Sequence, residues 1–336
     1  MTTPANNPNG TLNNPRMRWG IGASMVGVCL LLFIRCVNNP RRSTQPALKP
    51  YAGADCIIVA GERIPIGTRV VTWQEPNGYS AYRRGKHFDR SKPADGKPRY
   101  SQRSDLPPGM QGNNLSHNDL KQVVHQFVLH YDTCGCSRQC FKVLQDVRTL
   151  SVHFMLDVDG TIYQTLDLRE KAWHATTSNN FGVGIEIAHP GSWLSPLNAD
   201  MRRWYEQDEQ GWRQKFPKWM PETGLQTKGF VPRPDRPKFV SGRVNGVTYH
   251  QFDFTSQQYE ALPKLMAALN KALPRIRLDA PRDARGEIID RALPASTLRG
   301  FDGVVGHFHV QVNKRDPGPA FQWERVLREA RELRAR

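Results

Sequence analysis

The sequence predicts a mixed α/β fold, a central mixed β-sheet flanked by helices. Residues 126–131 and 182–188 are short apolar runs typical of buried strands. Residues 255–273 instead carry apolar side chains at helical spacing, behind a Thr255/Gln258 capping box. A last helix is expected at 322–334, where glutamates and arginines stand four residues apart. Because strands and helices alternate irregularly, we expect a mixed sheet covered by helices.

Three segments are expected to precede this domain. Residues 1–18 are rich in Asn, Pro and Thr and read as disordered. Residues 19–35 hold an apolar run that fits a transmembrane signal anchor or a cleaved signal peptide; a buried helix is the third reading. Residues 36–118 are expected to form a linker, two or three short strands and an exposed basic arm.

The positive charge is concentrated in the N-terminal third. Of the formal net charge of +16, residues 1–118 contribute +10, from 16 Lys+Arg and 6 Asp+Glu. Anionic lipid head groups or an acidic polymer are therefore the expected partners of this segment, and membrane contact is expected through the N-terminal run. No nucleic-acid partner is expected, because no nucleic-acid-binding motif accompanies the charge.

The cysteines outside the apolar run leave three readings open. Cys56, Cys134, Cys136 and Cys140 are even in number, which suits two disulfides outside the cytoplasm. Free thiols are the second reading. A metal cluster near His130 is the third, although the cysteine spacings are not those of a structural zinc site.

Residues with catalytic chemistry stand at strand ends and in loops. His130 ends an apolar strand, and His307 and Asp316 follow another, so these three residues could hold a catalytic zinc ion with one position open. Glu186 lies on an otherwise apolar strand, where a carboxylate is costly unless it has a role, such as taking a proton from water. Lys314 could neutralise an oxyanion.

Several motifs, in order, give the chain a family resemblance. It resembles the zinc-dependent N-acetylmuramoyl-L-alanine amidases of the amidase-2 family, in the AmpD-like branch, which share a fold with the peptidoglycan recognition proteins. The resemblance covers about residues 125–323 discontinuously. The motifs that carry it are residues 151–154, 159–164, 172–175, 184–187, 306–307 and 314–321.

The resemblance implies one zinc ion per chain, bound by His130, His307 and Asp316. It implies a general base at Glu186 and oxyanion stabilisation at Lys314. The bond cleaved would be the amide between the lactyl group of N-acetylmuramic acid and L-alanine. Peptidoglycan or muropeptides would be the substrate, and the location would be the cell envelope, outside the cytoplasm. A non-catalytic peptidoglycan-binding module is the alternative, disfavoured because Asp316 is present.

The resemblance also implies roles for residues beside this set. His174 and Trp173 match cleft positions that contact substrate. Cys134 and Cys140 match a disulfide pair of the recognition proteins. His309 is not excluded as a ligand, since on a continuing strand it would point the same way as His307.

The chain departs from the family pattern in a long insertion. The amidase domain is expected at 119–336, and its insertion at about 192–254 is rich in Trp and Pro. It is too long for an ordinary loop. It is expected either to wall the substrate cleft with aromatic surface or to form a structural flap.

Overall fold

The computed structural model describes residues 55–91, 93–112 and 114–336. The expected N-terminus at 1–18 and the expected anchor at 19–35 lie outside the described residues. Within the described ranges, no helix is both long enough and apolar enough to cross a membrane.

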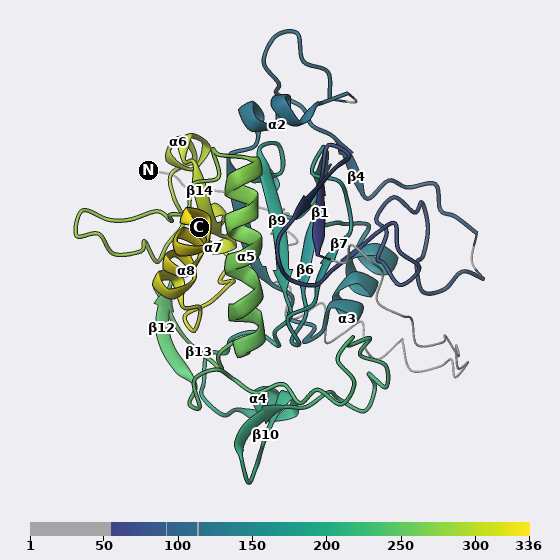
Figure 1. The fold of residues 1–336 in the computed structure, drawn as a ribbon. Coiled ribbons are helices and arrows are strands. Elements are labelled where there is room, and N and C mark those ends of the chain that lie inside the picture. The colour runs from purple at the N-terminus through teal and green to yellow at the C-terminus, as the bar shows by residue number, and fades with distance from the viewer. Residues whose placement is uncertain (1–54, 92, 113) are drawn as a thin grey trace, which may run out of the picture.

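A six-stranded mixed sheet forms the centre of the fold, which confirms the predicted fold class (Figure 1). Neighbouring strands run parallel except for the hairpin pair β6 and β7, which a turn at 157–160 connects. In spatial order the strands are β14 (Gly303–Gly306), β5 (Gln126–Tyr131), β9 (Gly182–Ile187), β6 (Phe154–Leu156), β7 (Ile162–Gln164) and β3 (Val70–Thr72).

Four antiparallel pairs surround this sheet. The short strands expected near residues 55–82 are present as β1, β2 and β3, and β3 joins the edge of the central sheet. Residues before 119 therefore contribute to the same fold. The pairs are β1 (Cys56–Val59) with β2 (Glu62–Pro65), β4 (Tyr100–Gln102) with β8 (Glu170–Ala172), β10 (Tyr205–Asp208) with β11 (Gly211–Gln214), and β12 (Val240–Val244) with β13 (Val247–Gln251).

The two predicted C-terminal helices are present and pack against each other. The longer begins at the predicted capping box, where the Thr255 hydroxyl accepts a hydrogen bond from the Gln258 amide at 3.2 Å. The helices are α2 (His117–Val123), α3 (Ser137–Phe141), the π-helix η1 (Lys142–Arg148), the 3₁₀-helix η2 (Thr176–Asn179), α4 (Ala199–Trp204), α5 (Ser256–Ala272), α6 (Ala295–Gly300), α7 (His307–Val310) and α8 (Trp323–Ala335).

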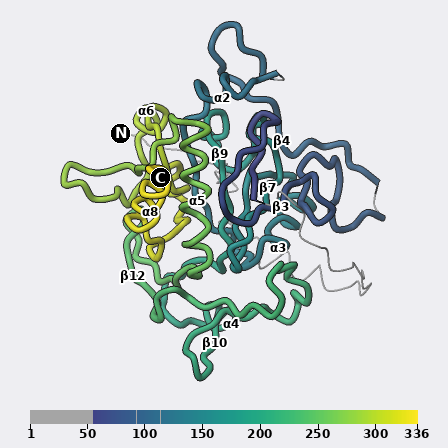
Figure 2. The backbone as a smooth tube through the Cα atoms, viewed as in Figure 1, coloured from purple at the N-terminus to yellow at the C-terminus, as the bar shows by residue number. Residues whose placement is uncertain are grey.

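Side-chain alternation on β5 separates the apolar core from the site. Phe127, Leu129 and Tyr131 belong to the main apolar cluster, together with residues of α5 and α8. Figures 1 and 2 show α5 lying along the sheet. Because successive strand residues point to opposite faces, His130 is directed to the face away from α5. The helix therefore supplies the core that holds the strand, while the opposite face is left for polar chemistry.

The segment expected as an exposed basic arm is partly buried. Arg99 and Arg103 are only 1% and 2% exposed. The Arg103 guanidinium donates hydrogen bonds to the carbonyls of Leu168 at 2.9 Å and Gly182 at 3.2 Å. Arg99 pairs with Asp95 of the arm at 2.7 Å and donates to the Gln145 carbonyl at 3.1 Å. These two arginines fasten the arm to the domain, because buried guanidinium groups need hydrogen-bond acceptors.

The cysteine prediction needs correction, because no disulfide is formed among the cysteines of the described ranges. Cys134 and Cys140 are buried in the apolar cluster around α3, where a cysteine packs as a small apolar side chain. Cys136 is also buried, and its thiol lies 3.4 Å from the Met220 sulfur. Burial raises the pKa of the Cys136 thiol, which keeps it protonated.

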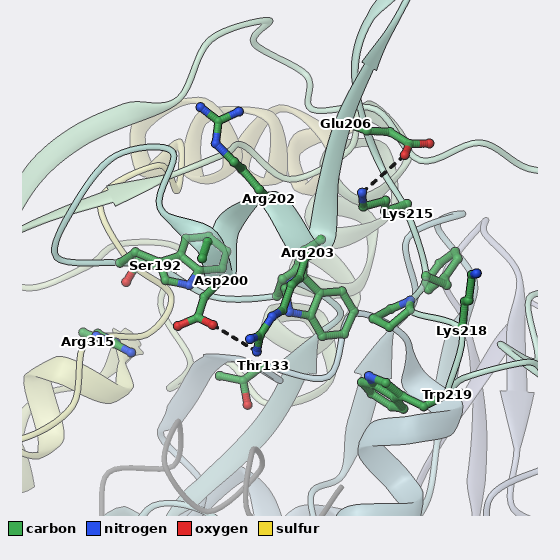
Figure 3. A pocket seen from close by; sticks show the side chains of 16 residues that line it. Thr133, Ser192, Asp200, Arg202, Arg203, Glu206, Lys215, Lys218, Trp219 and Arg315 are labelled. Atoms are coloured by element: carbon green, nitrogen blue, oxygen red, sulfur yellow. Dashed lines mark ion pairs between the residues drawn. The ribbon is translucent and has the colours of Figure 1, made fainter. Parts of the chain in front are cut away.

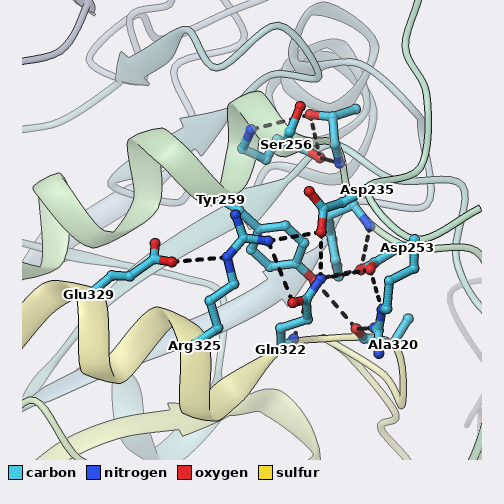
Figure 4. A network of polar contacts seen from close by, with 12 residues as sticks. Asp235, Asp253, Ser256, Tyr259, Ala320, Gln322, Arg325 and Glu329 are labelled. Atoms are coloured by element: carbon cyan, nitrogen blue, oxygen red, sulfur yellow. Dashed lines mark hydrogen bonds and ion pairs between the residues drawn. The ribbon is translucent and has the colours of Figure 1, made fainter.

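The end of the insertion is fastened to the two C-terminal helices by a buried polar network (Figure 4). Asp253 accepts hydrogen bonds from the Tyr259 hydroxyl of α5 at 2.6 Å and the Gln322 amide at 2.8 Å. Asp235 accepts one from Arg325 of α8 at 2.8 Å. The insertion is thus an integral part of the domain at this end.

Candidate active site

Three candidate ligands meet at the ends of two adjacent parallel strands. His130 is the second-last residue of β5, and His307 follows the neighbouring strand β14 as the first residue of α7. The loop after α7 then returns, and the Asp316 carbonyl accepts the Phe308 amide at 3.1 Å. This return brings the Asp316 carboxylate to the two imidazoles, and all three residues are buried.

The three ligand atoms form a nearly equilateral triangle. The Nδ1 atoms of His130 and His307 are 2.9 Å apart, and Asp316 Oδ2 lies 3.0 Å and 2.9 Å from them. A tetrahedral zinc ion with bonds of about 2.0–2.1 Å separates neighbouring ligands by roughly 3.3 Å. The spacing therefore fits three ligands of one zinc ion, and two imidazoles with one carboxylate are a suitable donor set.

The outer nitrogens of the histidines decide which lone pairs face the triangle. His307 Nε2 lies 2.9 Å from the Gln311 amide oxygen, which can only accept, so Nε2 is the donor and Nδ1 is the nitrogen that can offer a lone pair to a metal ion. His130 Nε2 contacts His174 Nδ1 at 3.0 Å. Burial, and then the neighbouring His307, lower the pKa of His130 to about 4, so this ring is neutral. If His130 Nε2 donates to His174, three lone-pair atoms converge on one point, an arrangement that suits a cation.

Glu186 lies beside this triangle on the same sheet face. It sits on β9 directly opposite His130 in the parallel register, and it is 4% exposed. Its Oε2 atom is buried without a hydrogen-bond partner among the described residues. Burial raises its pKa well above the usual value, and the Asp316 charge adds to this, while Lys314 opposes it. A carboxylate this poorly solvated can accept a proton from a neighbouring water.

Lys314 is positioned by the insertion. The Asn245 side-chain amide, in the turn between β12 and β13, donates to the Lys314 carbonyl at 2.8 Å. The Lys314 amide donates to the Gln311 carbonyl at 3.0 Å. The positive charge of Lys314 acts to lower the pKa values of both Glu186 and His130.

His174 packs against β9 and reaches His130. A Cβ on Gly184 would lie 2.4 Å from the His174 ring, so only glycine leaves room for it. The Nε2 atom of His174 is buried without a hydrogen-bond partner in the described part of the chain. Burial lowers the pKa of His174 well below its usual value, so the ring is neutral.

Other predicted residues lie apart from the triangle. The Trp173 indole donates to the Ser101 hydroxyl at 3.2 Å, so this side chain is bonded to β4. His309 bonds the Ile289 carbonyl at 2.6 Å and accepts the Gly306 amide at 2.9 Å. The chain turns into α7 after Gly306 instead of continuing as a strand, so His309 and His307 do not share a face. His309 is therefore structural.

Sequence reasoning missed the supporting residues. Gln311, Asn245 and Gly184 position His307, Lys314 and His174 through contacts that the linear sequence does not display. Only Gly184 could have been found from the sequence, because a glycine within an apolar strand often marks a position where another group packs closely against the backbone.

The comparisons agree with the predicted family. Residues 120–223 match the family model described as N-acetylmuramoyl-L-alanine amidase. This match confirms the predicted resemblance and the enzyme class that it implies. It spans His130, His174 and Glu186 and ends before His307, so the tertiary structure supplies the other half of the site.

Two solved structures are distantly similar to the chain. A selenomethionine derivative of AmpD shares 17% identity, over 69% of this chain and 90% of that chain, with a TM-score of 0.32. The amidase AmiD from E. coli, in complex with anhydro-N-acetylmuramic acid-L-Ala-D-γ-Glu-L-Lys, shares 16% identity over 69% of this chain and 65% of that chain, with a TM-score of 0.33. No curated protein matches the chain significantly.

Proposed function

We propose that this protein is a zinc-dependent amidase that hydrolyses the amide between the lactyl group of N-acetylmuramic acid and L-alanine of the stem peptide. The observation that carries the proposal is the triangle of His130, His307 and Asp316 with an unpartnered carboxylate, Glu186, beside it. The triangle would hold one zinc ion per chain. Bound zinc would supply Lewis-acid polarisation of the carbonyl and lower the pKa of water.

The chain's own residues would move the protons. Glu186 would take a proton from the attacking water and deliver it to the departing L-alanine amine, so that one water is consumed for each amide cleaved. Lys314 would stabilise the negative charge that develops on the carbonyl oxygen. His174 would donate its buried Nε2 proton to substrate, because in the neutral ring His130 occupies the other nitrogen. Trp173 would contact substrate beside His174.

We also propose a cell-envelope location outside the cytoplasm, with residues 19–35 as a membrane anchor. Fractionation of cells expressing the full chain tests this. Recovery in the membrane pellet, and release by detergent but not by high salt, would support the anchor, whereas a soluble protein would contradict it.

The activity is tested on purified peptidoglycan and on N-acetylmuramoyl-L-Ala-D-γ-Glu-L-Lys. We expect release of the free peptide, loss of turnover after chelation and recovery on adding zinc. Glu186→Gln should lower kcat by about 10²–10⁴-fold and keep its zinc. Exposed Glu209→Gln is the matched control. Zinc binding without peptide release by the wild type would instead support a binding module, and full activity of zinc-free enzyme would refute the metal site.

A further inference from the structure

A large pocket lies between the insertion, which forms most of its wall, and the loops that carry Thr133 and Arg315 (Figure 3). Its volume is about 1190 Å³, above the roughly 300–1,000 Å³ that is typical of small-molecule sites. Thr133, three residues after His130, and Arg315, next to Asp316, line the side that belongs to the rest of the domain. The pocket therefore lies beside the loops that follow His130 and precede Asp316, although those two residues do not line it, and it has room for several linked residues.

The pocket carries an excess of positive charge. Five basic residues and two acidic residues line it. Arg203 pairs with Asp200 at 3.2 Å, and Lys215 pairs with Glu206 at 3.4 Å. No carboxylate within the described ranges pairs with the remaining basic residues, which are Arg202, Lys218 and Arg315. An anionic ligand would therefore gain more in this pocket than a neutral one.

Arg315 is held in place for such a ligand. Its guanidinium lies over the Tyr249 ring, 5.0 Å from the centroid, and its hydrogen bond acts to lower the pKa of the buried Tyr131, which burial raises to about 12. Figure 3 shows Arg315 and Lys218 on opposite sides of the pocket. Lys218 is exposed and free to reach a second anionic group.

The wall between these two residues is built into the fold. A Cβ on Gly135 would lie 2.7 Å from the Trp204 ring, so the insertion packs directly on the loop after β5. Gln214 donates to the Gly135 carbonyl at 2.8 Å, and the Lys215 amide donates to the Trp204 carbonyl at 2.8 Å. Trp204 meets Trp219 edge-on at 6.1 Å. The aromatic wall is thus fixed, which lowers the entropy cost of binding.

We propose that this pocket binds the acidic stem peptide of the substrate, with one carboxylate at Arg315 and a second at Lys218. The inference rests on the proposed amidase function. A γ-linked glutamate keeps its α-carboxylate free, and the last residue of the peptide adds a terminal carboxylate. The sugars are uncharged once the lactyl group is in amide linkage, so the glycan would not use the excess charge. The charge thus selects the peptide over the glycan.

The test compares two substrates that differ only in charge: N-acetylmuramoyl-L-Ala-D-γ-Glu-L-Lys with both carboxylates free, and the same compound with both amidated. We expect the wild type to prefer the acidic form by about tenfold in kcat/KM, mainly through a lower KM. A hydrogen bond between charged groups strengthens binding by at least about tenfold. Arg315→Gln and Lys218→Gln should each reduce this preference. The preference is the ratio of the two kcat/KM values within one protein, so a general loss of activity in a variant does not alter it.

Lys228→Gln is the matched control, because Lys228 is exposed on the same insertion and does not line the pocket. Lys218→Gln alters an exposed side chain and should not affect folding, so it still tests the proposal if Arg315→Gln fails to fold. Equal turnover of the two substrates by the wild type, or an unchanged preference in both variants, would overturn the proposal. A KM that depends on glycan length instead would assign the pocket to the sugar. Absence of turnover with either substrate would refute the amidase function itself.

Discussion

At the scale of single residues, the site depends on groups that orient the candidate ligands. The Gln311 amide oxygen accepts the Nε2 proton of His307 and so presents the Nδ1 lone pair to the triangle. His174 contacts His130 in the same way. The ligands could be named from the sequence because histidine and aspartate at strand ends are few. Their orienting partners could not, because a glutamine four residues along is unremarkable until α7 forms.

Replacing Gln311 by leucine should weaken zinc binding by about 10–100-fold, because His307 would lose the partner that sets its protonation and ring orientation. Gln311→Glu keeps an acceptor and should bind at least as tightly as the wild type. Competition with a chromophoric chelator measures both constants without any need for turnover. Equal affinity for the leucine variant would show that Gln311 has no orienting role.

A buried histidine outside the site should make stability fall in acid. Burial lowers the pKa of His189 to about 3, and its Nδ1 accepts the Gly191 amide at 2.9 Å, which a protonated ring could not do. Between pH 6.5 and 3 the unfolded state binds the proton and the folded state does not, so stability is lost as pH falls, at about 1.4 kcal/mol per pH unit.

Chemical denaturation of the wild type and of His189→Gln, across that range, measures this contribution. The glutamine variant should be less stable near pH 7 and should show a shallower decline in acid. His153, also buried with a pKa of about 3, remains in both proteins and keeps the comparison matched. Identical slopes would assign the acid sensitivity to other groups.

At the scale of elements, the insertion is bonded to the rest of the domain at several points. Its strands β10–β13 are antiparallel pairs, and its ends are bonded to α5, α8 and the loop after β5. The sequence left open whether the insertion walls the substrate cleft or forms a structural flap. Composition reports Trp and Pro, but the long-range contacts that hold an insertion down join residues distant in the chain.

Gly135→Ala should disturb the contact between this wall and the loop after β5. The new Cβ would meet Trp204 at 2.7 Å in a backbone with φ of +72°. Gly246→Ala is the control, since its φ is +80° and nothing lies within 4 Å of the added atom. Both variants bear the cost of a left-handed alanine, but Gly135→Ala should lose about 1–3 kcal/mol more. Equal losses, measured by denaturant unfolding, would mean that the wall adapts without cost.

At the scale of the whole molecule, the described part of the chain is held by packing and hydrogen bonds, with no covalent cross-link between its cysteines. One apolar cluster joins α5, α8 and the strand face that they cover, and a second lies around α3 on the other side of the sheet. Buried arginines of the N-terminal arm add fixed contacts to both layers. The stability of this region should therefore be independent of redox conditions.

A strong reductant should shift the thermal midpoint of the protein by less than about 2 °C. A native disulfide would contribute about 2–5 kcal/mol, which corresponds to a fall of several degrees on reduction. Thermal scans with and without reductant, at equal protein concentration, make the comparison. A fall of several degrees would restore the disulfide reading of Cys134 and Cys140.

The sequence by itself determined the mixed α/β class, the strands at 126–131 and 182–188, the capping box of α5 and the candidate ligands, because these depend on local periodicity and on chemically scarce residue types. The tertiary structure decided which of the candidates meet. His130 and His307 are 177 positions apart, and only the parallel pairing of β5 with β14 makes them neighbours. It also decided that the cysteines pack as apolar side chains, that Arg99 and Arg103 are buried, and that the insertion closes a cationic pocket. The physical reason is the same in each case: burial, charge compensation and ligand geometry depend on which residues the folded chain brings together.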